Sequence, residues 1–127
     1  MKIKSSELIG PPLEWAVAKC EGHHDYRFDG KHGRISTGRH FDPTTDWSQG
    51  GPIIEREHIR WNEVGGQFYA WTPDHEWYDP LHEPMLDDLG VSWRAVQYGP
   101  TLLVAAMRCY VTAKLGDEVN IPEELLQ

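Results

Sequence analysis

The clearest pattern in the chain is a run of apolar residues that begins after Pro100 and stops at Gly116. A helix over this run would be apolar almost all round, which is typical of a core helix covered on several sides. A narrow polar stripe interrupts it at Thr101, Arg108 and Thr112. The pattern predicts a central buried helix over residues 100–115.

A second helix is predicted over residues 11–21. Two prolines follow Gly10, and proline is tolerated in a first helical turn because its missing N–H has no intrahelical partner there. Gly22 is a typical residue at which a helix stops. The apolar side chains between these limits recur at the spacing of one helical face, at Leu13, Ala16, Val17 and Cys20.

Strands are predicted where short apolar or alternating runs occur. These runs are residues 2–4, 53–61, 67–71, 91–96 and 119–121, of which 53–61 has the least regular period. Gly50, Gly51 and Pro52 predict a break before 53–61. Irregular loops are expected over most of 22–46, where a weak hairpin is the alternative, and at 72–90. We therefore expect one α+β domain over 1–127, with two main helices packed on a small, mostly antiparallel sheet.

The composition agrees with a globular domain and excludes several classes of protein. The chain has 127 residues, of which 39% are hydrophobic and 25% charged. No apolar run approaches the roughly 20 residues that span a bilayer, and the first residues show no secretory signal. Two cysteines, Cys20 and Cys109, do not make a disulfide framework. We expect a reducing cytoplasm and no membrane partner.

The net charge of −8 comes mainly from the second half of the chain, where residues 67–127 carry 3 Lys/Arg against 10 Asp/Glu. Such a surface repels phosphates, so binding to duplex nucleic acid is not expected. The segment 71–90 has six carboxylates and no Lys or Arg. It is interpreted as a solubilising surface. The alternative, around 74–88, is a patch that docks a basic host protein or imitates nucleic acid.

One stretch has the opposite charge. Residues 27–40 contain four Lys/Arg and a single Asp, with three glycines between them. Glycines let backbone N–H groups approach an anion, although the spacing matches no phosphate-binding motif. A surface loop is the favoured interpretation, and the alternative is an anion-binding loop carrying Lys31, Arg34 and Arg39.

The segment Asp46–Pro52 is the best candidate for a ligand site. It combines a flat indole, polar side chains and a flexible turn, which suits a pocket that stacks a planar ring and hydrogen-bonds its edge. The residues concerned are Trp47, Ser48, Gln49, Gly50 and Gly51. The alternative is that they serve the core and a required turn.

Arg108 needs a partner because it lies on a helix that is expected to be buried. A carboxylate such as Glu55 or Glu57 is the favoured partner, and a bound ligand is the alternative. Cys20, His23 and His24 are a weak candidate for a set of metal ligands, because no second closely spaced pair of Cys or His follows downstream to complete a site. Neither a metal nor a cofactor is therefore expected. No catalytic motif is present.

Three ordered stretches resemble the NinX family, small proteins of lambdoid bacteriophages whose function is unknown. They are KIKSSELIGPPLEWAVAKCEG (2–22), FDPTTDWSQGGPIIEREHI (41–59) and YGPTLLVAAMRCYVTAKLGDEVNIP (98–122). Residues 23–40 and 62–97 do not carry the resemblance. It implies a phage or prophage origin and a bacterial cytoplasm, and it implies neither an activity nor catalytic residues.

These features favour a non-enzymatic phage accessory protein that binds a small, nucleotide-like ligand. An acidic adaptor or inhibitor that binds a host protein is the alternative, and a small metal-dependent hydrolase is a weaker one. The sequence leaves open whether the chain forms a homo-oligomer.

Overall fold

The computed structural model describes residues 1–23, 25–31, 33–38, 40–73 and 93–126. In these residues the longer helices are α1 (Pro11–Cys20), α2 (Trp47–Arg56) and α3 (Leu102–Leu115), with short 3-10 helices at Ser5–Glu7 (η1) and Glu123–Leu126 (η3). The strands are β1 (Lys2–Lys4), β2 (Arg27–Asp29), β3 (Arg34–Ser36), β4 (His40–Phe41), β5 (Arg60–Val64), β6 (Gln67–Pro73), β7 (Trp93–Gly99) and β8 (Glu118–Asn120). The α+β class predicted from the sequence is confirmed.

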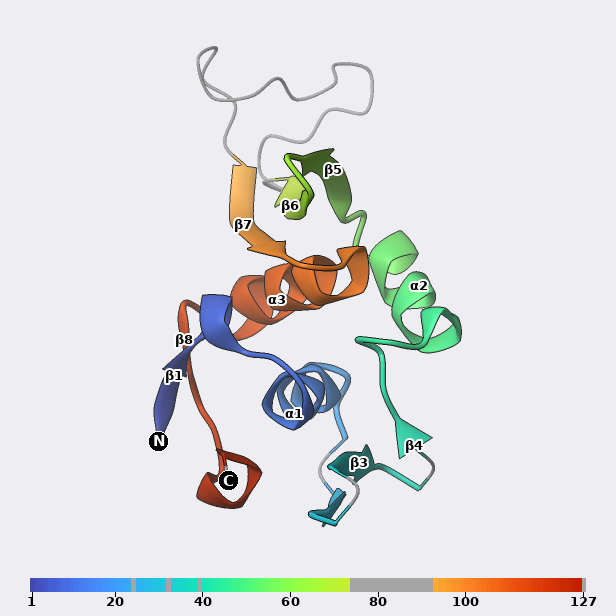
Figure 1. The fold of residues 1–127 in the computed structure, drawn as a ribbon, viewed down its shortest axis with the longest axis vertical. Helices are drawn as coiled ribbons and strands as arrows, with labels where there is room; N and C mark the ends of the chain where they lie inside the picture. The colour runs from blue at the N-terminus through green and yellow to red at the C-terminus, as the bar shows by residue number, and fades with distance from the viewer. Residues whose placement is uncertain (24, 32, 39, 74–92, 127) are drawn as a thin grey trace.

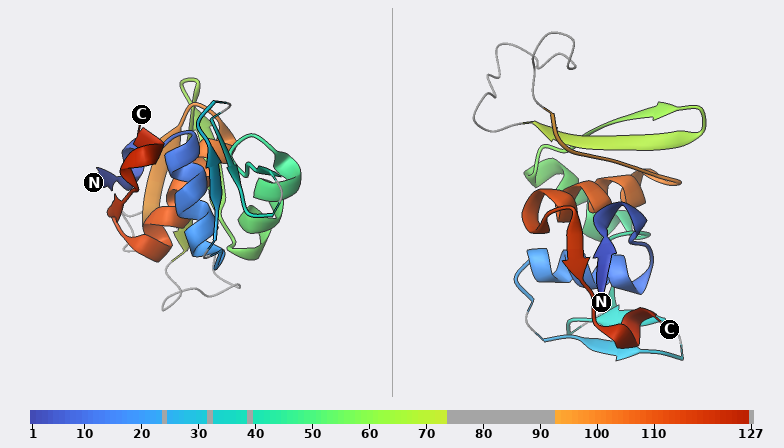
Figure 2. Two further views of the ribbon diagram at one scale, coloured as in Figure 1. Left: turned by 90° about the horizontal axis from the view of Figure 1, so that it is seen from below. Right: turned by 90° about the vertical axis from the view of Figure 1, so that its left-hand side faces the viewer.

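The described strands form three small antiparallel sheets, ordered β1-β8, β2-β3-β4 and β5-β6-β7. Two of these sheets lie at opposite ends of the molecule, with helices between them (Figure 1). From the side, the layers run from the β5–β7 sheet through α3 and α1 to the β2–β4 sheet (Figure 2). The helix α2 packs beside α3.

The core is built around α3, as its apolar sequence predicts. Every residue from Leu103 to Val111 is buried, because α3 contacts β6 and β7 on one side and α1 on the other. Thr101 caps the helix by accepting a hydrogen bond from the backbone N–H of Val104 (3.2 Å). The helix therefore begins at Leu102, slightly later than the predicted residue 100.

The helix α1 links the core to the β2–β4 sheet. Its apolar face buries Leu13, Ala16 and Val17, and it contacts both α3 and β3. Ile35 of β3 is fully buried, and the facing positions Phe28 and Phe41 are partly buried against the same core. Because side chains alternate along a strand, the neighbouring positions in β2–β4 point away from α1.

One sequence prediction about the middle of the chain is wrong, and another is incomplete. The expected break at Gly50–Pro52 and the expected strand at 53–61 are replaced by α2, and the strand β5 begins only at Arg60. The segment 22–46, expected to be mostly loop with a weak hairpin as the alternative, contains the short hairpin β2–β3, to which β4 adds a third strand. Most of the other expected loop, residues 74–90, lies outside the described residues.

The remaining predicted strands at 2–4, 67–71 and 119–121 correspond to β1, β6 and β8, each with bounds shifted by two residues or fewer. The predicted strand at 91–96 corresponds to β7, which begins at Trp93. Pairing of β1 with β8 places the two ends of the chain side by side. Within the part of the chain that the structure describes, no helix has the length and apolar character needed to cross a membrane.

Candidate functional site

The segment before α2 is held by its own polar side chains. Asp46 caps α2 by accepting hydrogen bonds from the backbone N–H of Ser48 (2.9 Å) and from its hydroxyl (2.7 Å). Asp42 accepts hydrogen bonds from the hydroxyls of Thr44 and Thr45. These contacts make the stretch 42–48 a rigid entry into a helix.

Gln49 fastens the first turn of α2 to β4. Its Oε1 accepts a hydrogen bond from the backbone N–H of Asp42 (2.8 Å). Its Nε2 donates to the carbonyl of His40 (3.1 Å) and to Asp46 Oδ2 (3.2 Å). The Gln49 amide therefore already has partners within the fold at both its oxygen and its nitrogen.

A cleft of about 500 Å³ opens between α2, the end of α1 and the turn between β3 and β4. From α2 it is lined by Ser48, Gln49, Pro52, Ile53 and Arg56, and from the other elements by Glu21, His23, Thr37, Gly38 and Phe41. The volume lies within the roughly 300–1,000 Å³ typical of small-molecule sites. We take this cleft, called the α2 cleft below, as the candidate functional site.

One wall of the α2 cleft is aromatic. The rings of His23 and Phe41 meet edge to face, with centroids 5.5 Å apart and an interplanar angle of 69°. On the opposite wall Pro52 lacks the N–H that would ordinarily bond the carbonyl of Ser48. The cleft therefore offers ring surface on one side and polar groups on the other.

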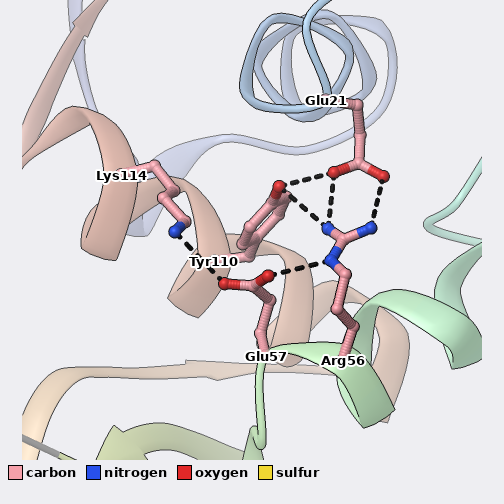
Figure 3. A network of polar contacts seen from close by, with 5 residues as sticks. All are labelled: Glu21, Arg56, Glu57, Tyr110 and Lys114. Carbon is pink, nitrogen blue, oxygen red and sulfur yellow. Dashed lines mark hydrogen bonds and ion pairs between the residues drawn. The ribbon is translucent and has the colours of Figure 1, made fainter. Parts of the chain in front are cut away.

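At one end of the cleft, Arg56 lies at the centre of a polar network (Figure 3). Its guanidinium donates two hydrogen bonds to the Glu21 carboxylate (2.6 and 3.1 Å), one to Tyr110 Oη (3.1 Å) and one to Glu57 Oε2 (2.9 Å). Tyr110 in turn donates to Glu21 (2.5 Å), and Lys114 forms an ion pair with Glu57 (3.3 Å). Two cations thus face two carboxylates.

The network shifts the pKa values of its members. Burial opposes ionisation of Glu21 and Glu57 and is the largest single effect on each. The hydrogen bonds and charges of the surrounding groups, led by Arg56 and aided by Tyr110 at Glu21 and by Lys114 at Glu57, together outweigh it, so both pKa values lie below the ordinary range. Burial together with the hydrogen bond to Glu21 raises the pKa of Tyr110. The carboxylates are therefore ionised and the phenol neutral near pH 7, and this end of the cleft carries no net charge.

Another pair of carboxyl groups, Glu14 and Asp42, lies where α1 meets the stretch 42–48, called the entry segment below because it leads into α2. Glu14 of α1 is only 6% exposed, and its carboxyl is hydrogen-bonded to Asp42 and Thr44. Its Oε2 is buried without a hydrogen-bond donor. Burial, followed by the hydrogen bond to Asp42 and the charge of Asp42, raises the pKa of Glu14 from 4.5 to about 8. A neutral Glu14 can donate its proton to Asp42, which ties the entry segment to α1.

The structure separates the predicted ligand residues. Ser48 and Gln49 line the α2 cleft, but Trp47 and Gly51 do not. The prediction assumed a turn, which would present these neighbours together, whereas a helix turns by about 100° per residue and spreads them over different faces. Trp47 is 55% exposed, and its ring lies on the side of α2 toward which a Cβ atom at Gly51 would point.

Gly50 is needed for packing within the fold. A Cβ atom at this position would lie 2.4 Å from the carbonyl oxygen of Pro43 and 2.6 Å from a methyl group of Leu103. Such distances are impossible for real atoms, so only glycine lets α2 approach α3 and the entry segment this closely. The close backbone approach expected of Gly50 serves this contact.

The expected partner of Arg108 is wrong. Arg108 is 8% exposed and donates hydrogen bonds to the carbonyl oxygens of Leu8 (2.7 Å) and Tyr98 (2.8 Å). Glu57 instead contacts Arg56 and Lys114. The reason is the rotation of α3, because a residue two positions before Tyr110 points to the opposite side of the helix. Arg108 is thus a structural clamp between η1 and β7.

The remaining candidates lie apart from the α2 cleft or outside the described residues. Lys31 and Arg34 are exposed around the turn between β2 and β3, whereas Arg39 falls outside the described part of the chain. Cys20 is half-buried, Cys109 is buried, and both are free thiols. Within the described residues no three His, Cys, Asp or Glu side chains could hold a metal ion together. His24 is not described.

Several residues of the cleft were not predicted from the sequence. Glu21 and Arg56 are 35 positions apart, and nothing in their spacing indicates that they meet. Tyr110 looks like an ordinary member of an apolar helix. The only signal was the DWSQGG stretch itself, which led to Ser48 and Gln49 but not to the opposite wall.

Comparison with known proteins is informative at the level of the family. A search of curated proteins finds no match to this chain. Residues 4–114 match the family model described as Bacteriophage P22, NinX. This match covers α1, α2, all of α3 except its last residue, and every residue that lines the α2 cleft. The chain therefore belongs to the NinX family of bacteriophage proteins.

Proposed function

We propose that this phage accessory protein is a non-enzymatic binding protein that holds a small, nucleotide-like ligand in the α2 cleft. The observation that carries the proposal is the pairing of the His23–Phe41 ring wall with the polar wall of α2 across a space of about 500 Å³. A planar ring with polar edges matches both walls.

The charges in the cleft favour the base and sugar of such a ligand as the buried part. Arg56 is already bonded to Glu21 and Glu57, so little of its charge remains to attract a phosphate. The Thr37 hydroxyl can donate to or accept from a ring edge or a sugar, and the Ser48 hydroxyl, which already donates to Asp46, can accept. Any phosphate would point out of the cleft, past the exposed His23.

Mass spectrometry of molecules released by denaturing the purified protein tests this directly. We expect a nucleoside or nucleotide, and we expect the same compound to raise the melting temperature when it is added back. Ligand at about 100 times its Kd stabilises a protein by about 2.7 kcal/mol, which a thermal scan resolves.

Two cleft variants and one matched control sharpen the test. Ser48→Leu fills the cleft and His23→Ala removes the ring at its rim, so both should lose the ligand. Trp47→Ala removes a larger ring from the other side of the same helix and should keep it. The proposal fails if no compound is released and no nucleoside or nucleotide shifts the melting temperature, or if Trp47→Ala alone abolishes binding.

A second function, an adaptor or inhibitor that binds a host protein, is supported by a different surface. The face of the β5–β7 sheet that points away from α3 carries exposed or half-exposed apolar side chains around a shallow hollow of about 280 Å³. They are Val64, Tyr69, Trp71, Val96 and Tyr98. Exposed aromatic clusters of this kind are typical of protein interfaces.

The sequence suggested the acidic residues 74–88 as the surface that docks a host protein, but these residues lie outside the described part of the chain. The apolar face of the β5–β7 sheet is a different surface for the same function. If a host protein co-purifies with the wild type, replacing both Val96 and Tyr98 by Ser should abolish its co-purification. Trp47→Ala, which removes an exposed ring elsewhere, should retain that protein. Loss of the same partner in Ser48→Leu would instead place it at the α2 cleft.

A further inference from the structure

The β2–β4 sheet has one face turned away from α1, and that face is basic. Phe28, Ile35 and Phe41 point toward the core, so the alternate positions form the outer face. These positions are Arg27, Asp29, Arg34, Ser36 and His40. The sheet lies at the end of the molecule (Figure 1), and no described element covers its outer face.

The cations of this face are exposed. The pairing of strands sets Arg27 opposite Ser36 and Arg34 opposite Asp29, so the two arginines are diagonal neighbours. Neither guanidinium has a hydrogen bond or ion pair to a described residue. Around them a shallow hollow of about 420 Å³ is also lined by Ser36 and His40. Lys31 extends the positive charge into the β2–β3 turn.

This face contrasts with the rest of the chain. Residues 27–40 carry four Lys/Arg and one Asp, whereas the whole protein has a net charge of −8. Unpaired guanidinium groups bind carboxylates and phosphates through charge-assisted, often bidentate hydrogen bonds. An acidic partner is therefore complementary to this surface, while the remaining surface repels it.

Two features favour an acidic protein segment over a nucleic acid. No Phe, Tyr or Trp lies at the described outer positions. Phe28 lines the hollow but is partly buried against the core, so bases would find little aromatic surface on which to stack. A nucleic acid also continues beyond the face, and its flanking phosphates would meet the net negative charge of the protein. A short acidic peptide can lie wholly within the basic face, so it avoids this repulsion.

We propose that the outer face of the β2–β4 sheet docks a carboxylate-rich segment of a partner protein, with Arg27 and Arg34 as the main contacts. This surface is separate from the α2 cleft, and the inference does not depend on the ligand proposed there. Lys31 adds positive charge at the β2–β3 turn, His40 can hydrogen-bond to a carboxylate at the β4 side, and Asp29 limits how many carboxylates fit between the arginines.

Titration with a short fluorescent polyglutamate peptide tests this, with a polyglutamine peptide of the same length as the neutral control. The variant with both Arg27→Gln and Arg34→Gln should bind the acidic peptide about tenfold more weakly, with an unchanged melting temperature. The matched control replaces Lys2 and Lys4 of β1 by Gln, which removes the same charge from exposed positions elsewhere. It should bind within about twofold of the wild type.

Amide shifts in an NMR titration of the wild type give a second measurement that needs no variant, and they should cluster in β2–β4. Equal weakening in both double variants would show only a general charge effect and would overturn the proposal. Absence of binding to the acidic peptide would also overturn it. Tighter binding of oligothymidine of the same charge at the same salt concentration would assign the face to nucleic acid instead.

Discussion

The helices α3 and α2 pack against each other but are held in place by different forces. All residues from Leu103 to Val111 of α3 are buried, and most of them are apolar, so its position is set mainly by apolar contact, with Arg108 and Tyr110 adding hydrogen bonds. In α2 only Gly50 and Ile53 are buried. Its position depends on directed polar contacts: the Asp46 cap, the Gln49 hydrogen bonds and the Arg56 network.

This difference separates stability from the geometry of the candidate site. Apolar burial is non-directional and tolerates small shifts, whereas hydrogen bonds fix a helix at a defined rotation. The helix that lines the α2 cleft is the one fixed by hydrogen bonds. Changes in α3 should therefore act on folding as a whole, and changes in α2 on the shape of the cleft.

The largest effect is expected from Met107→Asp in α3. Met107 is fully buried, and an unpaired carboxylate there costs several kcal/mol, which is comparable with a total stability of roughly 5–15 kcal/mol. We expect the variant to be unfolded by circular dichroism. The volume-conserving Met107→Leu should cost less than about 1.5 kcal/mol. A soluble Met107→Asp protein with the wild-type melting temperature would contradict the buried position of α3.

Glu14 should make stability depend on pH through the segment that leads into α2. Its pKa rises from 4.5 to about 8 on folding, so folding takes up a proton between these values. The free energy of unfolding should therefore fall as pH rises from about 4.5 to about 8 and then level off. Glu14→Gln removes this dependence and should stabilise the protein by about 2–4 kcal/mol above pH 8.

Urea unfolding of both proteins across this pH range measures the Glu14 contribution. At the acid end Glu21, Glu57 and Asp42 act in the opposite direction, because their folded pKa values are lowered and their stabilisation is lost as pH falls. Both proteins share the loss at Glu21 and Glu57, whereas the pKa of Asp42 is lowered in part by Glu14 itself. The difference between the two proteins therefore reports Glu14 together with its contact to Asp42. A difference that stays constant from about pH 5 to about pH 9 would show that Glu14 ionises freely in the fold.

Alanine substitutions at the two adjacent glycines of α2 are expected to change the free energy of unfolding in opposite directions. Gly50→Ala places a methyl group against Pro43 and Leu103 and should destabilise by about 1–3 kcal/mol. Gly51→Ala meets only the Trp47 ring at 3.6 Å and should stabilise by up to about 1 kcal/mol through helix propensity. Denaturant unfolding measures both. Equal signs would mean that the close packing of α2 on α3 is absent.

The smallest effect is expected at Trp47. Its ring is 55% exposed, so Trp47→Ala should change the free energy of unfolding by no more than about 0.5 kcal/mol. Gln49→Ala, two residues later, removes the hydrogen bonds to β4 and should cost about 1–3 kcal/mol. If the Trp47 variant were the less stable of the two, the assignment of Gln49 as the residue that fastens α2 would be wrong.

Local sequence patterns predicted α1 and α3 because their signals lie within the elements themselves. The apolar spacing of α1 and the continuous apolar run of α3 need no knowledge of the rest of the chain. The helix α2 was missed because it contains two glycines and a proline. In a helix interior each glycine is about 1 kcal/mol, and a proline about 3 kcal/mol, less favourable than alanine. The Asp46 cap and the tertiary contacts of Gly50 and Gln49 outweigh this low helix propensity.

The candidate site was predicted only in part for a related reason. The stretch DWSQGG drew attention to Ser48 and Gln49, which line the cleft, and to Trp47, which does not. Its neighbours in sequence were treated as neighbours in space, which holds for a turn but not for a helix. His23 was noticed as a weak metal ligand, and its contact with Phe41 had no sequence signal.

The α+β class, the central position of α3 and the family resemblance follow from the residues in order, since periodicity, capping and charge act between near neighbours. The partners of the buried and semi-buried charges do not follow from that order. Arg108 meets the Leu8 carbonyl 100 positions away, and Arg56 meets Glu21 35 positions away. Such pairs depend on how far each helix is rotated when it packs, and that rotation is set by the combined fit of all the surrounding side chains.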